Sequence, residues 1–237
     1  MKLCDARILF VDDEPSLLEI FAEWFAGESP VQITTAADGQ EALEKIESGD
    51  YDLLITDVNM PRVNGPELVR RIAASGKTLP GIVFVSGFGN IDLREMHGLG
   101  VEAFLAKPVL RDTLLDVVGR ALSERSELWL RHFDTAPRHS VSIKVLDFSD
   151  HTAGGHLALG RGGFSVCYAS PVAPGKVFFD CELTGPGLRL SGEGYLRWKS
   201  KTEGLIGIEI AYLDASCRSA VIEEIDRRRP TAFIPCR

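Results

Sequence analysis

The chain has 237 residues and an ordinary globular composition, with 45% hydrophobic and 25% charged residues. Its formal net charge of −8 argues against a protein that coats nucleic acid, because that role needs an excess of cations to neutralise phosphates. We therefore expect no DNA among its partners. Acidic residues predominate in residues 1–122, whereas the rest of the chain is nearly neutral, and this step in charge favours two domains.

The cysteines and the apolar runs bear on the cellular compartment. The five cysteines show neither the pairing of a disulfide framework nor the spacing of a zinc site, which is typical of a reducing cytosol. No apolar run is long enough to cross a bilayer. We therefore expect a cytoplasmic protein without membrane insertion.

Four short apolar runs in the first half each end in residues that phosphoryl chemistry can use. The runs at 8–11, 53–56, 82–85 and 104–106 lead into Asp12-Asp13, Asp57, Ser86 and Lys107. Runs of this length, separated by helix-length stretches, indicate parallel strands that are buried on both faces. With a further strand near 31–35 and helices near 15–25, 39–48, 65–74, 91–97 and from 110, they predict a flavodoxin-like, doubly wound α/β sheet.

The ends of these strands are expected to form one acidic site, because the carboxyl ends of parallel strands open on the same edge of a sheet. Asp12, Asp13 and Asp57 would then form a cluster of like charges that is costly unless a cation lies among them. Mg²⁺ suits such an all-oxygen site. We expect Asp13 and Asp57 to bind it directly, Asp12 through water, and Asn59 through its backbone carbonyl.

The same edge is predicted to carry out phosphoryl transfer. A carboxylate beside Mg²⁺ is a competent nucleophile toward a phosphoryl donor, and this role falls to Asp57. The ammonium of Lys107 and the hydroxyl of Ser86 are placed to neutralise the oxygens of the transferred group.

These residues resemble the receiver domain of bacterial response regulators, and the match covers about the first half of the chain. It rests on Val11-Asp12-Asp13-Glu14-Pro15, on Asp57-Val58-Asn59-Met60-Pro61-Arg62-Val63-Asn64-Gly65, on Ser86-Gly87 and on Phe104-Leu105-Ala106-Lys107-Pro108. The resemblance implies a two-component system or phosphorelay in which a histidine kinase or phosphotransfer protein phosphorylates Asp57. It also implies that Ser86 and Phe104 form the switch pair and that the Lys107–Pro108 bond is a candidate cis peptide.

A receiver of this kind is not an enzyme beyond catalysing its own phosphotransfer. Phe88 follows Ser86 by two residues and has no polar group that could position an attacking water. We therefore expect autodephosphorylation to be slow.

Apolar residues continue at helical spacing from Leu110 to Leu130, past the expected end of the receiver at residue 122. This pattern predicts a long last helix that packs on its own sheet and then leads into a linker, so that 123–136 form a helical extension. The alternative is an intermolecular coiled coil, which would make the protein a homodimer.

Residues 137–237 have the texture of a second, β-rich domain. Candidate strands at 141–148, 164–169, 176–183, 188–198 and 205–213 precede a helix at 215–229. Strands this short and evenly spaced predict a small antiparallel β-barrel with a C-terminal helix.

The order of these elements is similar to that of a PilZ domain, a bacterial barrel that binds cyclic di-GMP. The similarity lies in Pro137-Arg138-His139-Ser140-Val141, in Arg161-Gly162-Gly163-Phe164 and in the late strands. It implies that Arg138 and Arg161 would contact the ligand.

The ligand motifs of that family are eroded in this chain. Asp134 stands four residues before Arg138, where the family has an arginine, and Ala158 and Gly160 replace polar members of the second motif. Losing several charged contacts should weaken a micromolar site by about three decades. We therefore expect a degenerate PilZ-like output domain that acts through contacts with a downstream protein. The alternative is a cyclic di-GMP effector whose affinity depends on phosphorylation of the receiver.

Overall fold

The chain divides into two units, Met1–Glu124 and Arg125–Arg237. The computed structural model describes residues 6–26, 31–87, 99, 101–123, 128–148, 157–160, 162–199 and 204–228. The predicted domain bounds of 1–122, 123–136 and 137–237 stay predictions. In the part of the chain that is described, no helix has the length and apolar character needed to cross a membrane.

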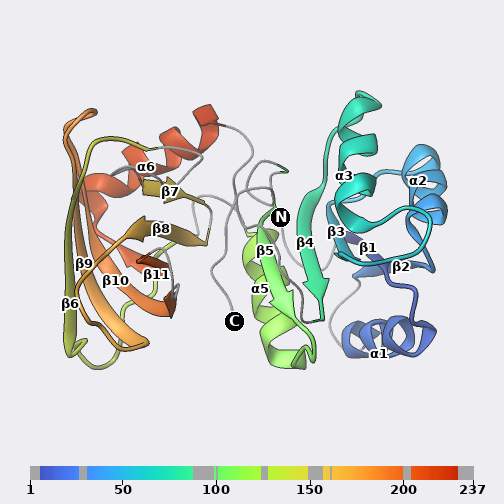
Figure 1. Ribbon diagram of the computed structural model, residues 1–237, viewed down its shortest axis with the longest axis horizontal. Coiled ribbons are helices and arrows are strands. Elements are labelled where there is room, and N and C mark those ends of the chain that lie inside the picture. The colour runs from blue at the N-terminus through green and yellow to red at the C-terminus, as the bar shows by residue number, and fades with distance from the viewer. Residues whose placement is uncertain are drawn as a thin grey trace. The chain divides into compact units, whose positions relative to one another are not determined.

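The described part of the first unit is built on a five-stranded parallel sheet (Figure 1). Its strands, β1 (Arg7–Val11), β2 (Gln32–Ala36), β3 (Leu53–Asp57), β4 (Gly81–Ser86) and β5 (Ala103–Ala106), lie in the order β2-β1-β3-β4-β5. Helices α1 (Pro15–Ala26), α2 (Gly39–Ser48), α3 (Gly65–Ala74) and α5 (Arg111–Ala121) follow β1, β2, β3 and β5. The predicted doubly wound α/β fold is confirmed, and the helix predicted near 91–97 lies outside the described residues.

Alternate side chains of β1 supply the two faces of this sheet. Leu9 joins the apolar cluster that contains Ala42 of α2 and Leu68 of α3. Phe10 points to the other face, where its ring centroid lies 5.3 Å from that of Phe21 of α1. Because both faces are covered by helices, the strands read as continuous apolar runs, which is why the sequence showed them clearly.

The described part of the second unit contains a curled, mixed sheet of six strands and one helix (Figure 1). The strands, β6 (His139–Val145), β7 (Leu157–Leu159), β8 (Gly163–Cys167), β9 (Gly175–Leu183), β10 (Leu188–Lys199) and β11 (Leu205–Leu213), lie in the order β6-β9-β10-β11-β8-β7. Helix α6 (Ala215–Arg228) follows β11. A bridge between Phe148 and Leu157 links the chain after β6 to β7, so the sheet forms a half-barrel.

The fold class predicted for this unit is confirmed, with two differences. Strands β6 and β9 pair in parallel, which the antiparallel prediction did not include. The reason is that β7 and β8 intervene between them, and a long connection permits parallel pairing. Strand β7 was not expected either, because its three residues are too few to show alternation.

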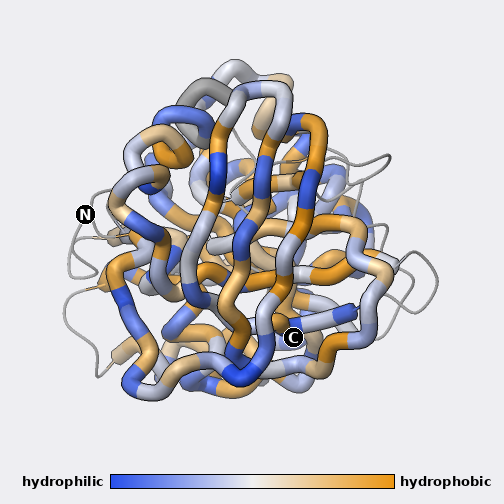
Figure 2. Tube along the Cα trace, turned by 90° about the vertical axis from the view of Figure 1, so that its left-hand side faces the viewer, coloured by the Kyte–Doolittle hydropathy of each residue, from blue (hydrophilic) through white to orange (hydrophobic). Residues whose placement is uncertain are grey.

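Strands β9 and β10 of the second unit alternate as half-buried strands should. In β9, the side chains of Val177, Phe179 and Cys181 are buried. Phe178, which lies between the first two, and Glu182, which follows Cys181, are exposed. Figure 2 shows the corresponding change between hydrophobic and hydrophilic residues along the strands that face the viewer. This alternation places one face of the sheet on the core and leaves the other in solvent.

The helix predicted from Leu110 is present as α5, but its predicted extension to Leu130 is wrong for the described residues beyond Ala121. Helix α5 ends at Ala121, and Leu128 and Trp129 lie in a turn, buried in the core of the second unit. The amide of Leu213 donates to the carbonyl of Trp129 at 3.0 Å, and Leu130 forms a bridge with Tyr212. Helical spacing identified apolar residues that need burial, but it does not identify the element that buries them. Residues 124–127 lie outside the described residues.

Replacing Trp129 with alanine should destabilise the second unit. Trp129 is 5% exposed in its core, and truncation of a buried tryptophan lowers the free energy of unfolding by about 3–5 kcal/mol. Urea unfolding followed by circular dichroism measures this change, and hydrogen exchange should show lost protection in β10 and β11 rather than in β1 and β3. The control is Leu130→Ala, since that side chain is 52% exposed. Equal, small effects of both substitutions would contradict the placement of Trp129.

Candidate functional site

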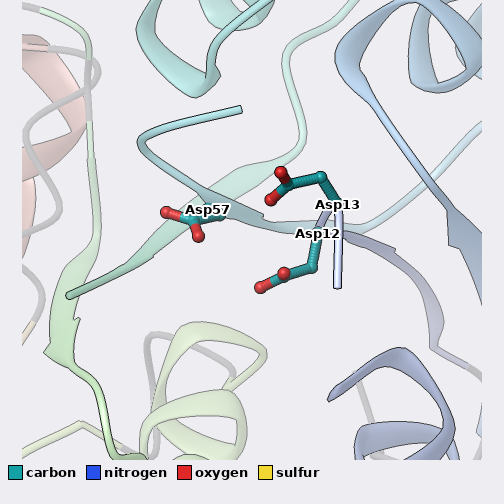
Figure 3. Close-up of side chains that lie close together, drawn as sticks. All are labelled: Asp12, Asp13 and Asp57. Carbon is teal, nitrogen blue, oxygen red and sulfur yellow. The ribbon is translucent and has the colours of Figure 1, made fainter. Parts of the chain in front are cut away.

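Three carboxylates lie together where two neighbouring strands of the first unit end. Asp12 and Asp13 follow β1, and Asp57 is the last residue of β3, which pairs in parallel with β1. One oxygen from each side chain lies within 4.8 Å of the others. Asp12 and Asp57 are buried and Asp13 is exposed, and Figure 3 shows the three side chains gathered at the strand ends. The predicted convergence of these residues is thus observed.

The ammonium of Lys107, just after β5, bridges two of these carboxylates. Its Nζ donates to Oδ2 of Asp12 at 2.8 Å and to Oδ2 of Asp57 at 2.6 Å. The amide of Lys107 donates to the carbonyl of Ser86 at 2.7 Å, which holds the backbone of Lys107 against β4. The bond between Lys107 and Pro108 is cis, as the resemblance implied. Residues from three strands therefore meet at one point.

One ammonium does not balance three carboxylates. Burial raises the pKa of Asp12, although hydrogen bonds from Lys107 and from the Glu14 amide act in the opposite direction. Burial alone would lower the pKa of Lys107, but its hydrogen bonds to Asp12 and Asp57 raise it overall. The lysine is therefore held charged, while the cluster keeps a negative charge that a further cation would neutralise.

The donor set fits a hard divalent cation such as Mg²⁺. All three clustered side chains offer carboxylate oxygens, and exposed Asp13 gives the site access to solvent. Asn59 lies beside them, with its amide N–H donating to Oδ1 of Asp57 at 3.0 Å. The assignment of the Asn59 carbonyl as a metal ligand stays a prediction.

Ser86 and Phe104, the predicted switch pair, lie on adjacent strands. Ser86 ends β4 and is buried, and its hydroxyl donates to the carbonyl of Gly87 at 3.0 Å and accepts from Nδ2 of Asn59 at 3.3 Å. Phe104 of β5 stands opposite Phe84 and is partly buried. Ser86 is thus joined to Asp57 through Asn59, whereas the switch role of the pair stays a prediction.

Of the two arginines predicted to contact cyclic di-GMP, one lies among the residues that the structure describes. Arg138 is exposed just before β6, and Arg161 lies outside the described residues. Ala158 is buried within β7, and Gly160 forms a tight turn in which its amide donates to the carbonyl of Gly163 at 2.8 Å.

Two features beside the acidic site were missed at the level of the sequence. A side chain on Gly65, the first residue of α3, would place Cβ 2.4 Å from the carbonyl oxygen of Asp57, so only glycine fits there. Asp38 caps α2, and its carboxylate is also paired with Arg62 in the loop after β3. The capping role could have been read from an aspartate placed just before a helix, whereas the pairing with Arg62 depends on tertiary structure.

Asp12→Asn should stabilise the protein when no divalent cation is present. Because the pKa of Asp12 is raised in the folded protein, its ionisation lowers the free energy of unfolding as the pH rises above about 4. Asparagine does not ionise and still offers an oxygen to the Glu14 amide. Urea midpoints in EDTA at pH 7 should be higher for the variant, and the difference should shrink toward pH 4.

Asp112→Asn is the matched control, because it also removes one negative charge but from a side chain that is 98% exposed. Added Mg²⁺ should raise the midpoint of the wild type more than that of Asp12→Asn. A lower midpoint for Asp12→Asn in EDTA at pH 7 would contradict the electrostatic account.

The comparisons with known proteins agree with this geometry. The family model "Response regulator receiver domain" matches residues 8–119. "Regulator of RpoS" of Escherichia coli K12 is 36% identical over 107 residues, which are 45% of this chain and 32% of that protein. The chain thus matches about a third of the length of that relative.

Two further similarities differ in extent. "Response regulator MprA" of Mycobacterium ulcerans is 31% identical over 218 residues, which are 84% of this chain and 90% of that protein. The crystal structure of the chemotaxis response regulator CheY4 of Vibrio cholerae is 31% identical, with a TM-score of 0.45 over 49% of this chain and 98% of that one.

The cluster of Asp12, Asp13 and Asp57 lies within the matched residues and is typical of the Mg²⁺ site of receivers. Receiver domains pair with histidine kinases and are typically phospho-acceptors rather than catalytic enzymes. The second unit is a β half-barrel of unassigned identity. By its receiver domain and its similarity along most of a curated relative, the chain belongs to the response regulators.

Proposed function

We propose that the protein is a signalling switch in which Asp57 accepts a phosphoryl group from a histidine kinase or phosphotransfer protein. The observation that carries this proposal is the position of the Asp57 carboxylate, which lies at a strand end beside two other aspartates and under the ammonium of Lys107. Because Asp57 is buried, its carboxylate is held in one position. A phosphoryl donor would approach it from the side of the cluster where Asp13 is exposed to solvent.

The transfer exchanges one bond to phosphorus for another. An oxygen of Asp57 attacks the phosphorus atom, the bond to the donor histidine nitrogen breaks, and the electron pair of that bond stays on the nitrogen, which takes up a proton. Asp13 and Asp57 would hold Mg²⁺, which would supply positive charge to neutralise the phosphoryl oxygens. Lys107 changes its hydrogen bond from Asp57 to a phosphoryl oxygen, and Ser86 donates to another after leaving the Gly87 carbonyl.

Asp57 should be the sole site of phosphorylation. Acetyl phosphate with Mg²⁺ should add one phosphoryl group to the wild type, and intact mass spectrometry measures the labelled fraction. Asp57→Asn should remain unlabelled because an amide is a poor nucleophile. Asp52→Asn is the control, since Asp52 lies just before β3 but pairs with Arg7, away from the cluster. Labelling of Asp57→Asn to the extent of the wild type would refute the assignment.

We also propose that the second unit acts through contacts with another protein rather than by binding cyclic di-GMP. The proposal is supported by Asp134, Ala158 and Gly160, which stand where charged or polar ligand groups are expected. Ala158 is buried in β7, so it contributes to the core instead of to a surface site. A half-barrel with an intact apolar core folds without such ligand groups.

Calorimetric titration of the full chain with cyclic di-GMP should show no binding with a dissociation constant below about 10 μM, which corresponds to roughly −7 kcal/mol. The comparison variant is Asp134→Arg, which replaces an opposing charge with a phosphate-binding group. If the wild type binds cyclic di-GMP with a dissociation constant below that value, the protein-contact proposal is wrong and the protein is a cyclic di-GMP effector.

Slow autodephosphorylation of Asp57 also remains part of the proposal, although Phe88 lies outside the described residues.

A further inference from the structure

Asp38 joins two loops that lie beside the acidic cluster. This buried residue is 5% exposed, and its carboxylate caps α2, with Oδ1 accepting from the amides of Gln40 at 2.7 Å and Glu41 at 3.0 Å. The other oxygen, Oδ2, accepts from the guanidinium of Arg62. Arg62 belongs to the loop 58–64, which connects Asp57 to α3. A single buried carboxylate thus ties the start of α2 to the loop that follows the phospho-acceptor.

The backbone of this loop is strained at the residue that Asp38 holds. Arg62 has φ of 66°, in the left-handed region that a residue with a side chain seldom adopts. Such a conformation persists only where surrounding contacts enforce it. The ion pair with Asp38 supplies one such contact, and Val63 supplies another by donating its amide to the Pro61 carbonyl at 2.8 Å.

The loop also packs directly on the first residue of α2. A side chain at Gly39 would place Cβ 2.4 Å from the carbonyl oxygen of Val63, so the two segments are in close backbone contact. The ion pair and this contact act at the same end of the loop. They therefore fix where the loop lies relative to the sheet.

The same loop contains Asn59, which contacts the site itself. Its amide N–H donates to Oδ1 of Asp57, and its side chain donates to the hydroxyl of Ser86. At the end of the loop, the amide of Gly65 donates to the carbonyl of Val58 at 3.2 Å. A shift of the loop would therefore move Asn59 relative to both residues.

The charge on Asp38 is maintained in the folded protein. Burial acts to raise its pKa, but the amides of Glu41 and Gln40 and the guanidinium of Arg62 together lower it. The carboxylate consequently stays ionised at neutral pH, and it is favoured further by the positive end of the α2 dipole. Arg62 then faces a permanent negative charge.

From this arrangement we propose that Asp38 and Arg62 are positioning residues for the metal and phosphoryl site, acting through the loop that carries Asn59. The inference rests on the proposed function of Asp57. Without the ion pair, the backbone at Arg62 leaves the left-handed conformation and the loop shifts. Asn59 then lies beside Asp57 and Ser86 for only a fraction of the time. The apparent affinity for Mg²⁺ falls in proportion to that fraction.

The test is calorimetric titration of the full chain with Mg²⁺, which needs no phosphoryl transfer. Arg62→Ala should weaken Mg²⁺ binding about tenfold, as is usual when a group that supports a metal ligand is removed. Arg62→Lys should restore part of the affinity because it keeps the charge. Asp38→Asn keeps an oxygen for the helix amides but loses the charge, and it should weaken binding to a similar extent.

The double variant Asp38→Asn with Arg62→Ala should bind Mg²⁺ no more weakly than either single variant, because each removes the same interaction.

Arg71→Ala is the matched control. This arginine of α3 also pairs with a carboxylate, that of Glu67, and its replacement should leave the affinity for Mg²⁺ unchanged. Urea unfolding separates the two kinds of effect, since a residue with a purely structural role changes the unfolding midpoint and leaves the Mg²⁺ affinity of the folded protein unaltered.

Wild-type affinity for Mg²⁺ in Arg62→Ala and Asp38→Asn, together with normal labelling of the wild type by acetyl phosphate, would overturn this inference alone. A wild type that neither binds Mg²⁺ nor becomes labelled would overturn the proposed function, and this inference with it.

Discussion

The bridge that Lys107 forms between Asp12 and Asp57 is the interaction on which the first unit depends. It brings the ends of β1, β3 and β5 together, and its hydrogen bond to Asp12 opposes the rise in the pKa of that carboxyl that burial causes. Because one ammonium leaves part of the negative charge unbalanced, the same cluster is suited to a hard cation and to the oxygens of a phosphoryl group. The reactivity of the site and the cost of ionising buried Asp12 therefore arise from one set of charges.

The backbone around the acidic site limits how Asp57, Ser86 and Lys107 can change their hydrogen-bond partners. Gly65 allows α3 to begin against the carbonyl of Asp57, and Asn59 joins Asp57 to Ser86 by hydrogen bonds. In the proposed phosphorylation, Lys107 exchanges Asp57, and Ser86 exchanges the Gly87 carbonyl, for oxygens of the phosphoryl group. Such exchanges between discrete partners are the local events that give a signalling domain two states.

The second unit has its own core, and that core includes residues near the start of the unit. Leu128 and Trp129 are buried with side chains of the half-barrel, and Leu130 is bridged to β11. Rotation of this segment about its own axis would expose a tryptophan to water, which is unfavourable by several kcal/mol. Leu128 and Trp129 are therefore part of the packed second unit rather than of a separate linker.

The sequence was sufficient to predict the α/β fold of the first half, because strands that are buried on both faces appear as apolar runs. It was also sufficient to predict the acidic site, because these runs lead directly into Asp12, Asp57 and Lys107. It also indicated the long strands β9 and β10, whose alternation is regular, and β11, which is an apolar run. Three features became known only from the tertiary structure: the parallel pairing of β6 with β9, the strand character of 157–159 and the burial of Trp129. The same holds for the pairing of Asp38 with Arg62, 24 residues apart. These features depend on which distant segment each residue meets, and local periodicity contains no information about that choice.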